Sequence, residues 1–245
     1  MRWVPEWLGQ CYARLSLEFG TRSFTANECS KVIEKKLSSA RVVLSKLSRE
    51  GYLLKRRVGG RVEYSCIDPY EVLLRCCLDL KLKEEYLPLA YEFLVQALKF
   101  LGDDLVSVVL YGSIARGDTH ECSDMDLLLV ARNLPRKFSE RIEYLYPIKR
   151  RCSRRKIELW REKGIYCSIQ IYPLLPSELK KFRPLFLDIV TDGVILFDRG
   201  NFMRRMMSQW RQKLKRAGAK KVVLPDKRWY WVLKPEIRRG EVIEL

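Results

Sequence analysis

The spacing of apolar residues changes along the chain and predicts two kinds of segment. Near the N-terminus they recur every three or four positions, which is typical of a helix with one buried face. The first such helix is predicted from Pro5, a residue suited to a first helical turn, to Phe19. Its predicted buried face consists of Trp7, Leu8, Cys11, Leu15 and Phe19.

Two shorter helices are predicted to follow. The second helix opens with Thr25 and Glu28, which have the spacing of a capping box. The third is predicted to be capped by Ser38 or Ser39 and to end at Gly51. The residues expected to point inward from this third helix are Val42, Val43 and Leu47.

Residues 52–66 are predicted to form a β-hairpin, because two extended runs flank Gly59-Gly60, a pair that suits a two-residue turn. Three helices followed by a hairpin resemble the winged helix-turn-helix fold of MarR- and ArsR-like regulators. The phrase Leu47-Ser48-Arg49-Glu50-Gly51-Tyr52-Leu53 adds to that resemblance. It implies that the third helix enters the major groove of duplex DNA and that the hairpin is the wing.

The nucleic-acid-binding residues expected from this resemblance carry hydroxyl groups or positive charges. They are Ser39, Arg41 and Lys46 on the third helix, and Lys55, Arg56, Arg57 and Arg61 in the wing. The alternative is that the winged helix docks a protein or joins two copies of the chain. Winged helices of this kind commonly work as dimers, so a homodimer is among the expected states.

The rest of the chain mixes helical and extended patterns, which predicts an α+β (mixed α/β) fold. Extended segments are predicted at 105–111, 126–130, 165–172, 193–197 and 228–233. Helices are predicted at 70–80, at 85–100, within 136–163, after Ser177 and at 201–216. The last helix is predicted to present one apolar face made of Phe202, Met206, Trp210 and Leu214. Pro173 and Pro176 are predicted to frame a loop.

The stretch from Tyr111 to Asp126 carries the candidate chemistry. The buried strand that ends at Tyr111 is followed by Gly112, which allows the backbone to come close to a ligand. Ser113 is predicted to cap a short helix, whose free N–H groups and positive dipole end suit a phosphate. These residues therefore predict a phosphate-binding turn.

Asp124 and Asp126 stand two positions apart at the head of an apolar run. In a strand, residues two apart share a face, so both carboxylates are expected to point the same way. Two carboxylates on one side repel each other unless a cation lies between them, and their hard oxygen atoms favour Mg²⁺ or Mn²⁺. The pair therefore predicts a divalent-metal site able to clamp a triphosphate.

Gly112-Ser113-x-x-Arg116-Gly117, followed by Ser123-Asp124-x-Asp126-Leu127-Leu128, resembles the signature of the DNA polymerase β-type nucleotidyltransferases, above all their minimal prokaryotic and archaeal members. The resemblance covers roughly residues 85–198. It implies a mixed sheet flanked by helices and Mg²⁺-dependent transfer of a nucleotidyl group from an NTP, with ATP as the expected donor. It also implies catalytic and metal-binding roles for Asp124 and Asp126, and nucleotide contacts from Gly112, Ser113, Arg116 and Gly117.

One position departs from that family pattern. These enzymes usually carry a third carboxylate on a later strand, and the corresponding residue is expected to be Gln170. Glutamine can form hydrogen bonds but cannot act as a base. Two alternatives therefore stay open: a DNA-binding regulator whose degenerate second domain senses a nucleotide, and an antitoxin-like partner that modifies or masks another protein.

The charge of the chain changes the expected partners. The formal net charge is +17 at pH 7, and Lys and Arg outnumber acidic residues strongly between residues 199 and 239. An excess of one sign favours polyanionic partners, since counterion release drives such binding. The expected partners are therefore nucleotide and nucleic acid, either duplex DNA or RNA.

No apolar stretch is long enough to cross a membrane, and the N-terminus lacks the apolar core of a signal peptide. A cytoplasmic protein without a membrane partner is expected. The 8 cysteines do not follow a zinc spacing, and His120 is the 1 histidine, so a structural zinc site is not expected. Disulfides in a cytoplasmic protein would indicate a hyperthermophilic, archaeal type of source.

These observations predict an N-terminal winged helix domain at 1–68, a helical connector at 69–84, a nucleotidyltransferase-like domain at 85–198 and a basic C-terminal extension at 199–245. The leading hypothesis is an enzyme that moves a nucleotidyl group from Mg²⁺-bound NTP to an acceptor that the sequence does not identify.

Overall fold

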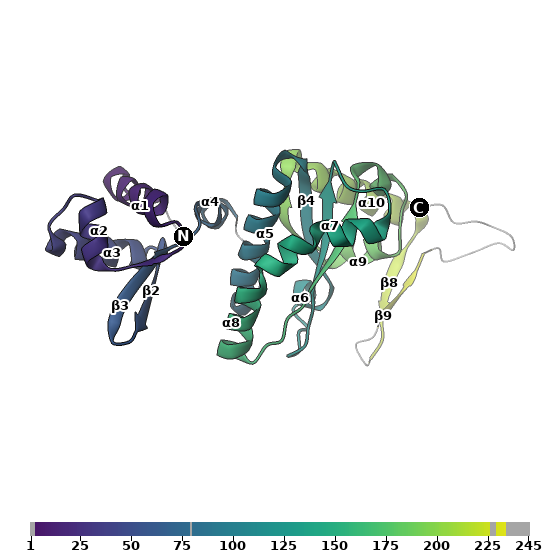
Figure 1. Ribbon diagram of the computed structural model, residues 1–245. Helices are drawn as coiled ribbons and strands as arrows, with labels where there is room; N and C mark the ends of the chain where they lie inside the picture. The colour runs from purple at the N-terminus through teal and green to yellow at the C-terminus, as the bar shows by residue number, and fades with distance from the viewer. Residues whose placement is uncertain (1–2, 79, 226–228, 234–245) are drawn as a thin grey trace, which may run out of the picture. The chain divides into compact units, whose positions relative to one another are not determined.

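The computed structural model describes residues 3–78, 80–225 and 229–233. Contacts between Cα atoms divide the chain into two compact units, Met1–Asp79 and Leu80–Leu245 (Figure 1). The four-part division expected from the sequence stays a prediction. Of its basic C-terminal extension, residues 226–228 and 234–245 lie outside the described residues.

Unit 1 consists of helices and one small antiparallel sheet. Its elements are α1 (Glu6–Phe19), β1 (Ser23–Phe24), α2 (Ala26–Val32), α3 (Leu37–Arg49), β2 (Leu53–Val58), β3 (Arg61–Cys66) and α4 (Pro69–Cys77). The strand order is β1-β3-β2. Val58 pairs with Arg61 around Gly59-Gly60, whose φ angles of 53° and 79° suit glycine. The predicted hairpin is therefore confirmed.

The helices of unit 1 confirm some predicted details and correct others. The side chain of Thr25 accepts a hydrogen bond from the backbone N–H of Glu28, so the predicted capping box is confirmed. In contrast, α3 begins at Leu37 with no side-chain cap, so the predicted serine cap is wrong. Val42 is 52% exposed and does not point inward. The residues that α3 buries are Ala40, Val43, Leu44 and Leu47.

Helix α1 also differs from its predicted pattern. Trp7, which was predicted to be buried, is 45% exposed, whereas Tyr12, which was not part of the predicted buried face, is buried. The hydroxyl of Tyr12 donates a hydrogen bond of 2.6 Å to the backbone oxygen of Ile67. The hydroxyl is thus satisfied inside the core, which is why a tyrosine is tolerated on the buried face.

Unit 2 is built on a mixed four-stranded sheet. Its strands are β4 (Leu105–Tyr111), β5 (Met125–Ala131), β6 (Ile169–Leu174) and β7 (Val194–Asp198), in the order β6-β5-β4-β7. β5 and β6 are parallel, and the other two pairs are antiparallel. The sheet confirms the predicted mixed type. β6 starts later than predicted, and Pro173 lies within it rather than in a loop.

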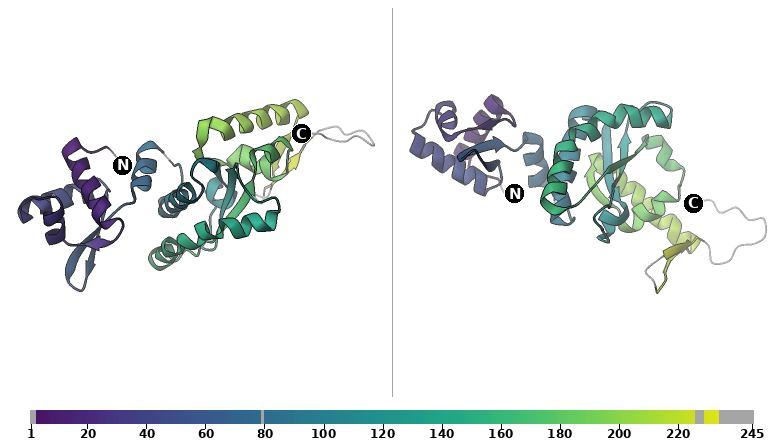
Figure 2. Two further views of the ribbon diagram at one scale, coloured as in Figure 1. Left: turned by 45° about the horizontal axis from the view of Figure 1, so that its top comes forward. Right: turned by 60° about the horizontal axis from the view of Figure 1, so that its bottom comes forward.

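Helices cover both faces of this sheet (Figure 2). They are α5 (Leu87–Leu101), α6 (Gly112–Arg116), α7 (Phe138–Arg151), α8 (Ser153–Lys163), α9 (Leu185–Asp192) and α10 (Phe202–Ala217), with short 3-10 helices at Glu84–Tyr86, Gly102–Asp104, Pro176–Lys180 and Arg199–Asn201. On one face, Val109 and Leu128 of the strands form a core with Phe186 and Trp210, from α9 and α10. The predicted face of α10 is partly wrong. Its buried residues are Met203, Met207, Trp210 and Leu214.

A buried arginine fixes α7 against the edge of the sheet. Arg141 is 4% exposed and donates hydrogen bonds to the backbone oxygens of Pro135, at 2.7 Å, and Pro173, at 3.3 Å. It also forms an ion pair of 2.7 Å with Glu178. The guanidinium therefore has partners on three segments, which offsets the cost of burying its charge. This anchor holds α7 and β6 in place beside the site described below.

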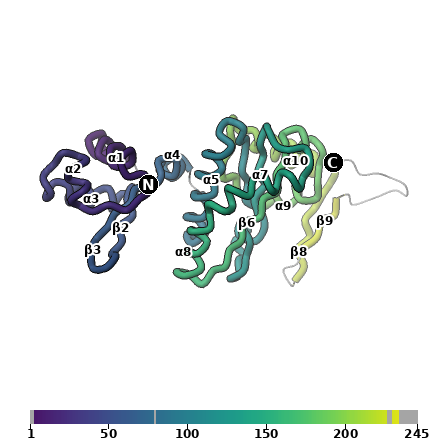
Figure 3. The backbone as a smooth tube through the Cα atoms, viewed as in Figure 1, coloured from purple at the N-terminus to yellow at the C-terminus, as the bar shows by residue number. Residues whose placement is uncertain are grey.

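The described end of the chain is a two-stranded hairpin, β8 (Lys220–Val223) and β9 (Trp229–Val232) (Figure 3). β9 matches most of the predicted strand at 228–233, although Arg228 lies outside the described residues. β8 was not predicted. Lys221 forms an ion pair of 2.8 Å with Asp192 of α9, and Trp231 packs against the core. No helix among the described residues is long and apolar enough to span a membrane.

Candidate active site

The turn after β4 lies against a carboxylate of the neighbouring strand. Gly112 has a φ of 78°, a conformation that side-chain-bearing residues rarely adopt. A Cβ atom on Gly112 would collide with Oδ2 of Asp126 and would lie 3.4 Å from its Cγ. Tyr111 and Asp126 are partners in the antiparallel register of β4 and β5. The fold thus brings together the two halves of the motif that lie apart in the sequence.

The short helix α6 differs from its prediction in one detail. It begins at Gly112, directly after Tyr111, with no side-chain cap, so Ser113 lies in its first turn and is not its N-cap. It ends at Gly117, whose φ of 80° is left-handed. Nε of Arg116 donates a hydrogen bond of 3.1 Å to Oδ2 of Asp118. Gly112, Ser113, Arg116 and Gly117 therefore all lie in one turn beside Asp126.

The two aspartates of the motif form an electrostatically strained pair. Asp126 is the second residue of β5, and Asp124 comes just before the strand. Burial raises the pKa of Asp126, the charge of Asp124 raises it further, and Arg116 opposes the shift. Burial also raises the pKa of the Tyr111 hydroxyl to about 12, with the charge of Asp126 as the second cause. A divalent cation between the carboxylates would remove this repulsion.

The donor set at this position fits a hard divalent metal ion. Carboxylate oxygens are the preferred ligands of Mg²⁺ and Mn²⁺. In the described parts of the chain, no group of three or more His, Cys, Asp or Glu residues is arranged to hold a metal. Mg²⁺ sites that bind nucleotides usually combine one or two carboxylates with phosphate oxygens and water, and the Asp124–Asp126 pair would supply the two carboxylates.

An amide, not an acid, lies beside this pair on the next strand. The parallel register of β5 and β6 pairs Asp126 with Gln170. Gln170 is exposed, and its Nε2 donates a hydrogen bond of 3.1 Å to Oγ of Ser168. The side chain at this position can accept or donate hydrogen bonds but adds no negative charge.

The loop that leads to Asp124 is held by its own hydrogen bonds. The hydroxyl of Ser123, which is 2% exposed, accepts a bond of 2.8 Å from the backbone N–H of His120. The backbone N–H of Ser123 returns a bond of 3.0 Å to the oxygen of His120. Nδ1 of His120 accepts a further bond of 3.2 Å from Cys122. His120 thus shapes the loop that carries Asp124.

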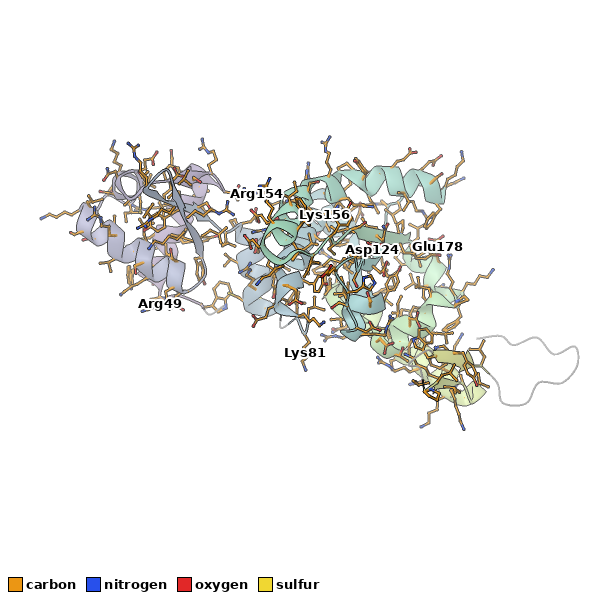
Figure 4. All side chains as sticks on the ribbon, turned by 90° about the horizontal axis from the view of Figure 1, so that it is seen from below. Arg49, Lys81, Asp124, Arg154, Lys156 and Glu178 are labelled. Atoms are coloured by element: carbon orange, nitrogen blue, oxygen red, sulfur yellow. The ribbon has the colours of Figure 1, made fainter. Side chains whose placement is uncertain are left out.

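The structure brings two charged residues, Lys149 and Asp188, close to the motif, and neither was assigned to the site from the sequence. Lys149 on α7 has its pKa lowered by burial and by the charge of Lys156, while Asp124 opposes the shift. Asp188 on α9 has its pKa raised by burial, while Arg116 opposes the shift. Figure 4 labels Asp124, with Lys156 among the side chains around it. Only the packing of α7, α8 and α9 on the sheet brings these residues close to the motif.

The predicted nucleic-acid-binding residues all lie in unit 1. Ser39, Arg41 and Lys46 are exposed on α3, as are Lys55, Arg56, Arg57 and Arg61 in the β2–β3 hairpin. Nζ of Lys46 lies 5.1 Å from the ring centroid of Trp7. The chain therefore carries its two sets of candidate residues in separate units.

Comparison with known proteins identifies the family to which the chain belongs. The family model described as "Nucleotidyltransferase domain" matches residues 92–191, which include the whole motif. A protein of Methanocaldococcus jannaschii, named "Putative protein adenylyltransferase MJ1305", is 35% identical over 125 residues, which are 51% of this chain and 80% of that protein. The chain belongs to the nucleotidyltransferase family. As a nucleotidyltransferase, it is a transferase enzyme with a role in nucleotidyl transfer.

Solved structures show only weak likeness to this nucleotidyltransferase. A toxin–antitoxin complex with AMP-PNP has 17% identity and a TM-score of 0.31, and it covers 51% of this chain and 90% of its own. A mutant of the toxin–antitoxin MntA–HpeT has 14% identity, the same TM-score of 0.31 and the same coverage of 51% and 90%.

Proposed function

We propose that this nucleotidyltransferase transfers the adenylyl group of ATP to a hydroxyl group of a protein acceptor. The observation that carries the proposal is the contact between the Gly112 turn and the Asp126 carboxylate, with Asp124 beside it. The protein acceptor is suggested by the name of the M. jannaschii relative, which the chain matches over most of that protein's length.

Each residue of the motif has a role in this proposal. Asp124 and Asp126 would hold Mg²⁺ or Mn²⁺, and such an ion would polarise the phosphate and offset its charge. The backbone of Gly112 and Gly117 and the hydroxyl of Ser113 contact the phosphates. Arg116 offsets part of their negative charge, since its guanidinium already lies near Asp126.

The proposed reaction exchanges one phosphorus–oxygen bond for another. The acceptor oxygen forms a bond to the α-phosphorus of ATP, while the bond from that phosphorus to the bridging oxygen of the β-phosphate breaks. Pyrophosphate leaves, and the hydroxyl proton passes to water. Gln170 lies beside Asp126 and can hydrogen-bond the acceptor hydroxyl, but it cannot remove its proton.

The full chain is expected to bind one Mg–ATP by calorimetry, and chelation of the metal by EDTA is expected to abolish the binding. When the chain is incubated with Mg²⁺ and candidate proteins, label is expected to be transferred from the α-phosphate of ATP and not from the γ-phosphate. Transfer from the γ-phosphate would instead indicate a kinase. Absence of metal-dependent nucleotide binding would overturn the proposed function.

We also propose that unit 1 is a winged helix-turn-helix that binds duplex nucleic acid. The support is its element order, with the β2–β3 hairpin after the third helix and β1 completing a three-stranded antiparallel sheet, and the exposed basic side chains of that hairpin. In such a fold α3 contacts the bases, and Lys55, Arg56, Arg57 and Arg61 contact the phosphate backbone.

Replacing Lys55 and Arg57 together with glutamine is expected to weaken duplex binding and to reduce its dependence on salt. Each lost phosphate contact lowers the slope of log K against log salt by about 0.9. Fluorescence anisotropy with a labelled duplex at several salt concentrations measures both quantities. Arg14→Gln, on α1, is the matched control and is expected to change neither. No binding by the unaltered chain at low salt would exclude the proposal.

A further inference from the structure

An apolar cavity opens beside the two aspartates of unit 2. It has a volume of about 150 Å³, and a cavity of about this size can hold a benzene-sized group. Both aromatic side chains in its lining are largely open to solvent, Trp160 at 57% and Tyr166 at 62%. The lining residues are Ser153, Lys156, Ile157, Trp160, Tyr166 and Cys167. Exposed aromatic and aliphatic side chains gathered in one place are typical of a binding surface.

The inner wall of the cavity adjoins the aspartates. Cys167 lies just before β6, and burial raises the pKa of its thiol to about 11, with the charge of Asp124 as the second cause. The backbone N–H of Tyr166 donates a bond of 2.8 Å to Glu121, in the loop before Asp124. The cavity is thus attached to the segment that carries Asp124.

The cavity and the Gly112 turn flank the aspartates on opposite sides. The strand order β6-β5-β4 puts the β5 aspartates between the start of β6, which the cavity adjoins, and the end of β4, which leads into Gly112. A nucleotide whose phosphates contact the Gly112 turn leaves the β6 side open. The group that attacks the α-phosphorus must come from a side not occupied by the leaving phosphates, because attack and departure are in line.

Lys156 lines the cavity, and Lys149 on α7 lies close enough to Lys156 and Asp124 for the charges of both to act on it. Lys149 and Lys156 are half-buried, the charge of Lys156 helps to lower the pKa of Lys149, and neither lysine forms an ion pair within the described residues. By contrast, Arg154 and Arg155, which lie with Lys156 on α8, form ion pairs with Glu158 at 3.1 Å and 2.9 Å. Two neighbouring cations without a partner favour the binding of an anionic group.

We propose that this cavity and the two lysines form the acceptor-binding subsite, and that the acceptor is an acidic polypeptide segment. One apolar side chain of the segment enters the cavity, and an acidic side chain contacts Lys149 and Lys156. A hydroxyl-bearing residue between them then lies next to Asp124 and Asp126. This proposal rests on the proposed function and adds to it the chemistry of the protein that is modified.

The lining of the cavity favours a polypeptide over a nucleic acid. Its surface is mostly apolar, with Ser153 and Lys156 as the main sources of polar atoms away from the aromatic rings. A nucleobase buried there would leave most of its polar edge without hydrogen-bond partners, which costs free energy. An aliphatic or phenyl side chain has no such requirement, so it is the better match.

The test measures adenylylation of short synthetic peptides by the full chain, with ATP labelled at the α-phosphate. Each peptide has one serine, threonine or tyrosine. One neighbouring position is either leucine or alanine, and another is either aspartate or alanine. The unaltered chain is expected to prefer peptides with leucine and aspartate. Trp160→Ala is expected to raise KM for leucine peptides by about tenfold, the usual effect of a lost apolar contact, with little change in kcat. Lys149→Gln together with Lys156→Gln is expected to remove the preference for aspartate.

Tyr146→Ala is the matched control, because Tyr146 is 58% exposed on α7 and does not line the cavity. It is expected to keep both preferences. The proposal is overturned if Trp160→Ala leaves the leucine preference intact, if no peptide is labelled, or if single-stranded RNA is labelled in place of peptides. Calorimetry of Mg–ATP binding separates these results from a failure of the proposed function, which would remove nucleotide binding from the unaltered chain.

Discussion

Replacing both Asp124 and Asp126 with asparagine is expected to reduce nucleotidyl transfer by at least about 10³-fold, which corresponds to about 4 kcal/mol of lost transition-state stabilisation. Asparagine keeps the size of each side chain but removes the negative charge that holds a divalent cation. Transfer of label from the α-phosphate of ATP, followed over time at saturating Mg²⁺, measures the loss. Glu140→Gln, a change of the same type at an ion pair on the surface of α7, is the control and should retain transfer.

The same variant separates metal binding from folding. Because the pKa of Asp126 is raised in the folded state, the charged pair costs stability once the pH rises above the value at which this carboxyl ionises in the unfolded chain. Without metal at pH 7, the double variant is therefore expected to melt no lower than the unaltered chain. Added Mg²⁺ should raise the melting temperature of the unaltered chain alone. A rise of equal size in the variant would show that the metal binds elsewhere.

The part of the site that the sequence predicts well is the part made by local geometry. The strand ending at Tyr111 and the strand carrying Asp126 are apolar runs that can only be buried, and Gly112 between them suits a turn. The spacing of Asp124 and Asp126 follows from the two-residue period of a strand. These features depend on residues only a few positions apart, so they can be predicted from a single sequence.

Features that depend on packing between distant segments were missed or misplaced. The predicted serine cap of α3 is wrong because the helix already begins at Leu37. Val42 is exposed because the buried face of α3 is formed by Ala40, Val43, Leu44 and Leu47. β8 is short and rich in lysine, and its pairing with β9 is what defines it as a strand. Likewise, Trp160 and Tyr166 lie on separate elements, and only the packing of α8 beside β6 makes them line one cavity.

Gln170 combines a feature that the local sequence predicts with one that depends on the pairing of strands. The alternation of apolar and polar residues identified it as an outward position on a strand near the aspartates. The parallel register that makes it the direct partner of Asp126 comes from the sheet. Its role in the reaction stays a prediction, as do the roles of the other motif residues.

Replacing Gly112 with alanine is expected to lower transfer by at least about 10²-fold, the usual cost of moving a reacting group by about 1 Å. The new Cβ would collide with Oδ2 of Asp126, so the carboxylate has to move away from the position that faces the metal. The φ of 78° adds backbone strain of roughly 1–2 kcal/mol to the loss of stability. Calorimetry of Mg–ATP binding and the rate of label transfer measure the first effect, and denaturant unfolding measures the second.

Gly102→Ala distinguishes the collision from the strain. Gly102 also has a positive φ, 53°, but a Cβ atom there has no neighbour within 4 Å. This variant is expected to lose stability through strain while transfer stays within about twofold, as for most changes away from a site. If both variants lost transfer equally, the loss would come from destabilisation alone. A loss specific to Gly112→Ala means that the close approach of this glycine to Asp126 is what keeps the carboxylate in position for the metal and the nucleotide.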